Sequence, residues 1–554
     1  MKLALRGATV VDGTGAPAIK ADVLVTDGVV TRISTLSTMH ASEADESIDL
    51  DGLVLAPGFI DPHTHYDAQV LWDRDLTPSS WHGITSVVTG NCGFGIAPVS
   101  PEGRDLVMRT LENVEGMPLA ALQAGISWTF ETFPEYLDAV DAEPLRCNVA
   151  ALLGHTPLRF NVLGQEATER AATQDEVARM REIVAEGMAA GAIGFSTSRS
   201  ESHRGAFGRP VPSRLAELSE IWELAGAVGD AGHGTIEATW GPDFHVEECA
   251  QLAADIGRPI TWAAIMVVRD HPEMSVDLER RVAAAGGAGT QVFPQVACRP
   301  IVAQVTLADP APLANVPAFG EILSLDHHER PALYADPQWR ERAYAGVREK
   351  WGNKLDEATV QETGIHRELQ GGPTLGELAA ERGGTALDVA VELALAEDLA
   401  TRFRIVMIND DEEQVGRLLQ NRSMLLGLSD AGAHTSQLCD ANFATYLLQR
   451  WVRELGVLSL EDAVWRLTGQ PAMVYGLTGR GTIAPGSVAD LVAFNPDTVG
   501  TGPLERIVDF PGGADRLVAP SSGIEHVWVN GHHTRIDGKD VPGARFGRVL
   551  RGGI

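Results

Sequence analysis

The stretch TQDEVARMREIVAEGMAAGAIGFSTS (173–198) shows how the middle of this chain is built. Thr173 and Glu176 match the capping box that begins a helix, and apolar residues then recur at helical spacing on one face. Gly191 is the residue type that commonly ends a helix, and 192–197 has the apolar character of a strand. The stretch therefore predicts one helix followed by one strand.

The same unit repeats downstream. Helices are predicted at 218–230 and 246–256, and strands at 235–240 and 259–267. Helices that connect strands in series produce parallel neighbours, so this α/β pattern over 57–479 predicts a TIM-like (β/α)8 barrel. The periodicity fails between about 268 and 372, which predicts an insertion beside the mouth of the barrel, and regular units resume at Thr374.

The two ends of the chain resemble each other and differ from the middle. Residues 1–56 and 480–554 contain short apolar runs separated by tight-turn signals such as Asp12-Gly13 and Asp27-Gly28. We expect them to form one small β-sandwich domain built from both termini.

The composition limits the classes of partner. The 554 residues carry a net charge of −31, which argues against nucleic acid or an anionic membrane surface as partner. We expect neither a signal peptide nor a transmembrane helix. The five scattered cysteines favour the reducing cytoplasm, and the oligomeric state stays open. Lysine is scarce, and none lies between Ala21 and Glu349.

The strongest chemical signal is PGFIDPHTHYDAQ (57–69). Side chains alternate along a strand, so His63 and His65 are predicted to project to the same side at its C-terminal end. Two convergent imidazoles there provide half of a zinc site. A pair of histidines with purely structural hydrogen bonds is the alternative.

Several further motifs accompany these histidines. Cys92 lies in GITSVVTGNCGFG (83–95) and Asp430 in MLLGLSDAGAH (424–434), each after an apolar strand. The other motifs are GHTPLR (154–159), GAIGFSTSR (191–199) and RLTGQPAMVYGLTGRGTIAPGSVADLVAFNP (466–496). Together they resemble the amidohydrolase superfamily, specifically its N-acyl-D-amino-acid deacylase (D-aminoacylase) branch. The resemblance covers nearly the whole chain, and it implies a metal-dependent hydrolase on a TIM-like barrel.

The resemblance implies a role for four residues. His63 and His65 match metal ligands, and Cys92 matches the cysteine ligand of this branch. Asp430 matches an aspartate that binds metal and accepts a proton from the attacking water. Many relatives use a carboxylated lysine where this branch uses the cysteine, but the region that would have to supply it has no lysine here. The alternative for Cys92 is an inert buried thiol.

The chain departs from the branch at two ligands. Histidines are expected at the ends of two middle strands, where this sequence has Thr239 and Ala264. Glu237, on the same strand face as Thr239, is either a metal ligand or a hydrogen-bonded neighbour of the site. One Zn²⁺ is therefore favoured over two. The nearby histidines that receive no role are His155, His203, His233 and His434.

The resulting hypothesis is hydrolysis of an amide C–N bond by metal-activated water, with an N-acyl amino acid or related small amide as substrate. Arg199 is the candidate to bind a substrate carboxylate, unless it is an ordinary surface arginine. Two alternatives stay open: a hydrolase of another amide class (dipeptide, cyclic imide, carbamate or aryl amide), and a non-catalytic binding protein with this fold.

Overall fold

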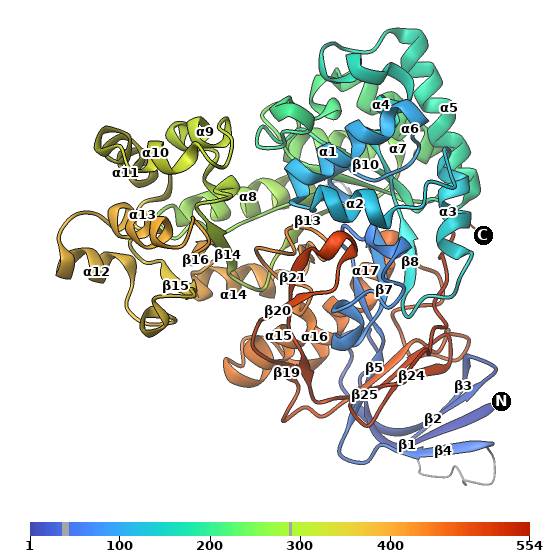
Figure 1. Cartoon of the computed structure of the whole chain (residues 1–554). Helices are drawn as coiled ribbons and strands as arrows, with labels where there is room; N and C mark the ends of the chain where they lie inside the picture. Colours follow the sequence, from blue (N-terminus) through green and yellow to red (C-terminus); the bar gives the residue numbers. More distant parts are fainter. Residues whose placement is uncertain (36–43, 287–290, 554) are drawn as a thin grey trace.

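A closed barrel with eight parallel strand positions lies at the centre of the molecule (Figure 1). The structure is a computed structural model, and it describes residues 1–35, 44–286 and 291–553. The strands are β6 (Phe59–Asp61), β7 (Ile84–Thr89), β8 (Asn148–Ala151) continued by β9 (Leu153–Gly154), β10 (Gly194–Ser198), β11 (Thr235–Thr239), β12 (Ile260–Ala263), β13 (Val292–Val296) and β17 (Leu425–Leu426). The first and last strands meet where Thr64 pairs with Ala431 and the His65 N–H donates to the Ala431 carbonyl at 2.8 Å. The HxH segment therefore lies on the seam that closes the barrel.

The predicted helix–strand series is confirmed. The Thr173–Glu176 capping box precedes α5 (Gln174–Ala190), and Gly191 ends this helix in the left-handed conformation at φ 107°. The helices α6 (Leu218–Ala231), α7 (Val246–Ile256) and α8 (Pro272–Ala285) follow, and their apolar faces pack on the barrel core. Each crossover helix thus covers the strands that it connects.

Both ends of the chain contribute to one β-sheet, which lies beside the barrel (Figure 1). Its strands are β1 (Lys2–Val10), β2 (Ile19–Thr26), β3 (Val29–Ser34), β4 (Glu46–Asp49), β5 (Val54–Pro57), β18 (Leu491–Phe494), β23 (Ile524–Val529), β24 (His532–Ile536) and β25 (Lys539–Asp540). The two termini are joined where β5 pairs antiparallel with β18. Residues from both ends, including Leu5, Val23 and Trp528, form a separate hydrophobic core. The predicted fold class, a barrel with a small β-domain from both termini, is confirmed.

The structure places the insertion later in the chain than the predicted 268–372. A second hydrophobic core runs from Ala303 to Ile405 and belongs to a lobe that protrudes from the barrel (Figure 1). The lobe contains a three-stranded sheet of β14 (Ile301–Thr306), β16 (Arg402–Ile408) and β15 (Thr359–Glu362). Its helices include α9 (Pro317–Leu323), α11 (Pro337–Trp351), α12 (Leu375–Arg382) and α13 (Ala386–Ala396).

Two of those helices explain the error. The apolar spacing of α12 and α13 is that of barrel helices, but both pack on the core of the lobe. In contrast, α8 lies inside the predicted insertion and packs on the barrel. None of the helices in the described parts of the chain has the length and apolar character needed to cross a membrane.

Candidate metal centre

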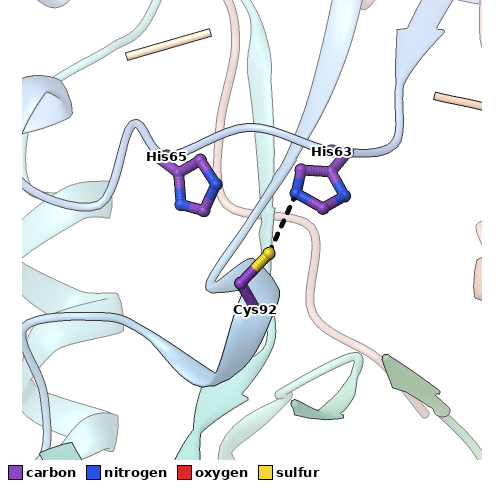
Figure 2. A group of neighbouring side chains, drawn as sticks. All are labelled: His63, His65 and Cys92. Atoms are coloured by element: carbon purple, nitrogen blue, oxygen red, sulfur yellow. Dashed lines mark hydrogen bonds between the residues drawn. The ribbon is translucent and has the colours of Figure 1, made fainter. Parts of the chain in front are cut away.

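The two histidines of the HxH segment face the same side of the chain. Their ring centroids lie 5.4 Å apart, and both residues are at most 2% exposed. Thr64, between them, donates its hydroxyl to the Val88 carbonyl at 2.8 Å. Figure 2 shows both rings on the side of the chain where Cys92 lies. The convergence expected from their spacing is therefore present.

A tight turn after β7 carries Cys92 into the barrel mouth. Gly90 and Gly93 adopt left-handed conformations at φ 83° and 74°, and Cys92 itself has φ 57°. A Cβ on Gly90 would lie 2.2 Å from the Leu152 carbonyl oxygen, so the turn fits only without a side chain there. The Cys92 Sγ lies 3.3 Å from His63 Nε2 (Figure 2).

Together, His63, His65 and Cys92 form a cluster in which one ligand atom from each lies within 4.8 Å of the others. The Asp430 Oδ1 atom lies 3.3 Å from His63 Nε2 and 3.9 Å from His65 Nε2. The Asp430 side chain is 32% exposed, so this carboxylate faces both the buried cluster and solvent.

Glu237 adjoins the cluster from β11. Its Oε2 atom accepts a hydrogen bond from the Cys92 N–H at 2.6 Å, and the residue is fully buried. Its Oε1 atom has no hydrogen-bond partner among the described residues. Burial raises the pKa of this carboxyl to about 8. Glu237 is therefore a neighbour of Cys92 with one oxygen still available.

Two further site residues were not predicted from the sequence. Glu115, at the end of α1 (Arg104–Glu115), places Oε2 3.5 Å from His65 Nε2. Gln295, on β13, places Oε1 2.7 Å from His63 Nδ1. Neither lies in a pattern that indicates metal binding, although Gln295 is a polar residue within a buried strand, VFPQV.

Burial keeps the isolated cluster neutral. It lowers the pKa of both His63 and His65, and the neighbouring histidines lower that of His65 further. Burial raises the pKa of the Cys92 thiol and of the Glu115 carboxyl, and the surrounding carboxylates raise both further. Neutral imidazole is the form that binds a metal, and a bound cation favours the ionised thiol and carboxyl groups.

The available atoms fit a zinc ion. Imidazole nitrogen, thiolate sulfur and carboxylate oxygen are the ligands that zinc binds in proteins. Two buried atoms here, His65 Nδ1 and Glu237 Oε1, have no hydrogen-bond partner within the described structure. Buried polar atoms normally have a partner, and the Glu237 carboxyl adjoins Cys92, where a bound cation would supply one.

The Arg199 guanidinium has partners within the protein, and its role in binding a substrate carboxylate stays a prediction. Its guanidinium pairs with Asp243 through Nε at 3.0 Å and through Nη2. Its Nη1 donates to the Ser213 and Ala216 carbonyls at 2.9 and 2.7 Å. Through these contacts the guanidinium joins the segment after β10 to neighbouring loops.

The remaining histidines divide into two groups. His203 and His434 lie near the cluster: the His203 ring centroid is 5.3 Å from that of Phe94, which is itself 6.5 Å from that of His65, and the His434 N–H donates to the Glu115 carbonyl at 2.5 Å. His155 instead bonds Thr197 and Glu220, each at 2.8 Å, and His233 is half-buried beside Ala231 and Gly553. Ala264 packs against an apolar group of Ala263, Ala297 and Leu428. The site therefore has no imidazole at position 264.

A cluster of metal-ligand side chains at the mouth of a (β/α)8 barrel, with a β-domain from both termini, is the arrangement of an amidohydrolase. The chain matches the sequence profile of the amidohydrolase family over residues 46–274 and 338–534, and it belongs to that family. The predicted family is thus confirmed.

Two curated relatives span nearly the whole chain. A D-aminoacylase of Alcaligenes xylosoxydans xylosoxydans is 32% identical over 99% of this chain and 97% of that protein. An N-acyl-D-glutamate deacylase of the same organism is 30% identical over 100% of this chain and 96% of that protein.

Two solved structures are similar to this chain over nearly its whole length. The N-acyl-D-glutamate deacylase of Bordetella bronchiseptica, complexed with zinc and a phosphonate mimic of the tetrahedral intermediate, superposes with a TM-score of 0.64 at 26% identity. A D-aminoacylase with a binuclear metal centre gives a TM-score of 0.66 at 28% identity. Each comparison covers 99% of both chains.

Proposed function

We propose that this protein is a zinc-dependent hydrolase that cleaves the amide bond of N-acyl-D-amino acids. The observation that carries this proposal is the buried His63, His65 and Cys92 cluster with Asp430 beside it. The full-length relatives named as D-aminoacylase and N-acyl-D-glutamate deacylase support the substrate class.

His63, His65, Cys92 and Asp430 are the residues that would hold the ion. A bound zinc ion lowers the pKa of water toward neutrality and polarises a carbonyl group. One ion is favoured over two, because Thr239 and Ala264 offer no imidazole where the branch has histidines.

Asp430 is the proposed proton carrier. Its carboxylate borders the cluster and is partly open to solvent, so both water and a small substrate can reach it. As water adds to the substrate carbonyl carbon, Asp430 accepts a proton from that water. It then donates the proton to the amine nitrogen while the C–N bond breaks, which releases a carboxylic acid and an amino acid.

We further propose that the protein works in the cytoplasm on small molecules, without a nucleic-acid or membrane partner. All five cysteines are buried and free of disulfides, which suits a reducing compartment. The net charge of −31 disfavours polyanionic partners.

The test combines zinc analysis with a substrate panel of N-acyl-D- and N-acyl-L-amino acids. We expect stoichiometric zinc and hydrolysis of the D-series. Asp430→Asn, compared at equal zinc content, is expected to lower kcat by about 100-fold or more, because the proton carrier is lost. Asp309→Asn, which changes an exposed aspartate on the lobe, is the control and should retain wild-type activity.

Other outcomes separate the alternatives. Full activity of Asp430→Asn with unchanged zinc would contradict the proposed proton transfer. Hydrolysis confined to dipeptides, cyclic imides, carbamates or aryl amides would replace the substrate class. A wild-type protein with far less than one zinc per chain and no chelator-sensitive activity would be a binding protein.

A further inference from the structure

Glu115 is a buried carboxylate in an unfavourable position. It is the last residue of α1, and Gly116 ends this helix in the left-handed conformation at φ 58°. A carboxylate at a helix C-terminus is repelled by the negative end of the helix dipole. Glu115 is also only 4% exposed, so water does not solvate its charge. Its position therefore requires a nearby positive partner or a retained proton.

The described part of the chain provides no permanent cation of this kind. Among the ion pairs of the described residues, Glu115 has His65 as its partner and no arginine or lysine. The nearby ionisable groups include the carboxyl groups of Asp430, Asp67 and Glu237, which are also negative when ionised. Cys92 adds a thiol to the same cluster. Four carboxyl groups and a thiol thus lie near two neutral imidazoles.

The distances fit shared coordination better than direct hydrogen bonding. Glu115 Oε2 lies 3.5 Å from His65 Nε2, beyond the usual 2.7–3.2 Å range of an N–H···O hydrogen bond. Neighbouring ligands of one four- or five-coordinate zinc ion, each bonded at about 2.1 Å, lie about 3.0 to 3.6 Å apart, depending on the bond angle. The distance of 3.3 Å between His63 Nε2 and Asp430 Oδ1 also matches the separation of two ligands of one zinc ion.

We propose that Glu115 is a ligand of the metal ion, supplying a carboxylate in a site that lacks two of the histidines expected for its branch. The inference rests on the proposed metal-dependent function. It assigns the centre the donors of His63, His65, Cys92, Asp430 and Glu115, which combine nitrogen, sulfur and oxygen. The Glu237 Oε1 atom, buried beside Cys92 without a hydrogen-bond partner among the described residues, independently marks this cluster as lacking a partner.

The test measures metal binding directly. Zinc affinity of the chelator-treated full-length chain is measured by competition with a chromophoric chelator, and the cobalt-substituted protein is examined by its visible absorption spectrum. We expect Glu115→Gln to weaken zinc binding at least about tenfold and to change the cobalt spectrum. Glu112→Gln is the matched control, because Glu112 lies one turn earlier on the same helix and, among the described residues, makes no ion pair with His65 as Glu115 does.

The outcomes are distinguishable from those of the proposed function. If Glu115 only accepted a hydrogen bond from His65, Glu115→Gln would lower the Tm of the metal-free protein and leave zinc affinity and the cobalt spectrum unchanged. That result, or a wild-type chain that binds no zinc, overturns the inference. If the protein binds zinc through Glu115 but hydrolyses no N-acyl amino acid, the inference stands and the substrate proposal fails. Should Glu115→Gln not fold, an unchanged cobalt spectrum in Glu115→Asp overturns the inference, and an altered one supports it.

Discussion

A single hydrogen bond determines how His63 faces the cluster. The Gln295 Oε1 atom lies 2.7 Å from His63 Nδ1, and both residues are buried. An amide oxygen can only accept, so His63 carries its proton on Nδ1. The lone pair is then on Nε2, the atom that lies close to Cys92 and Asp430. Gln295 is thus a positioning residue that keeps the ligand nitrogen available.

Replacing Gln295 by leucine is therefore expected to weaken zinc binding by about 10- to 100-fold, because the ring loses the acceptor that fixes its tautomer and orientation. The measurement is chelator competition on the purified variant. Gln470→Leu is the control: Gln470 is equally buried, but it donates to the Arg422 and Met424 carbonyls. Equal losses of zinc affinity in both variants would show that the effect is general destabilisation.

The turn after β7 is the element that holds Cys92 at the barrel mouth. The atoms around its backbone leave little space for an added side chain. Gly90 combines a φ of 83° with a Cβ position only 2.2 Å from the Leu152 carbonyl oxygen. Gly52, in an exposed turn before β5, has a φ of 84° and nothing within 4 Å of its Cβ position. The two glycines share a left-handed backbone and differ in steric contact.

This pair separates backbone strain from crowding. Each change to alanine should cost about 1–2 kcal/mol for the left-handed conformation. Gly90→Ala should cost about 1–3 kcal/mol more, because the Leu152 backbone must shift. It should also weaken zinc binding, since Cys92 moves with the turn. Thermal unfolding and chelator competition measure these effects. Equal losses of stability in Gly90→Ala and Gly52→Ala would refute the steric explanation.

The sequence predicted those parts of the architecture that depend on local signals. The Thr173–Glu176 capping box, the helix end at Gly191 and the alternating His63 and His65 each follow from residues close together in the chain. The same local signal misplaced the insertion, because the apolar pattern of a helix does not specify which hydrophobic core it packs on.

Contacts between distant segments account for what the sequence did not predict. Arg199 pairs with Asp243, 44 residues later, and no motif indicates that contact. Glu115 reaches His65 across 50 residues because α1 ends at the barrel mouth, and Gln295 reaches His63 from another strand. A carboxylate or amide that reaches a site only through tertiary packing has no characteristic sequence spacing from the other site residues. The two histidines of an HxH segment do have one.

The whole molecule joins distant segments through buried polar groups, and His82 is one of them. This histidine is fully buried in the 3₁₀ turn η3 (Ser79–His82). Its Nδ1 lies 2.7 Å from the Thr445 hydroxyl, and its Nε2 lies 3.0 Å from the Ala519 carbonyl. Since a carbonyl only accepts, the Nε2 proton donates to Ala519, and the neutral ring connects the barrel to the C-terminal segment.

The buried ring predicts a pH dependence of stability. Burial lowers the pKa of folded His82 to about 3, from an unfolded value of 6.5. Between these values the unfolded chain binds the proton and the folded chain does not, so stability falls as pH decreases from about 6.5 toward 3. His82 contributes a slope of up to about 1.4 kcal/mol per pH unit in this window, and none above it.

His82→Gln keeps a polar side chain at this position but cannot titrate. The Tm of this variant should therefore fall less steeply than that of the wild-type protein between pH 6.5 and 4, even if its Tm at pH 7.5 is lower. Calorimetry across this range measures both slopes. His328→Gln is the control, because that histidine is exposed on the lobe, and its slope should match the wild type. An unchanged slope in His82→Gln would show that His82 is not a group whose protonation drives acid destabilisation.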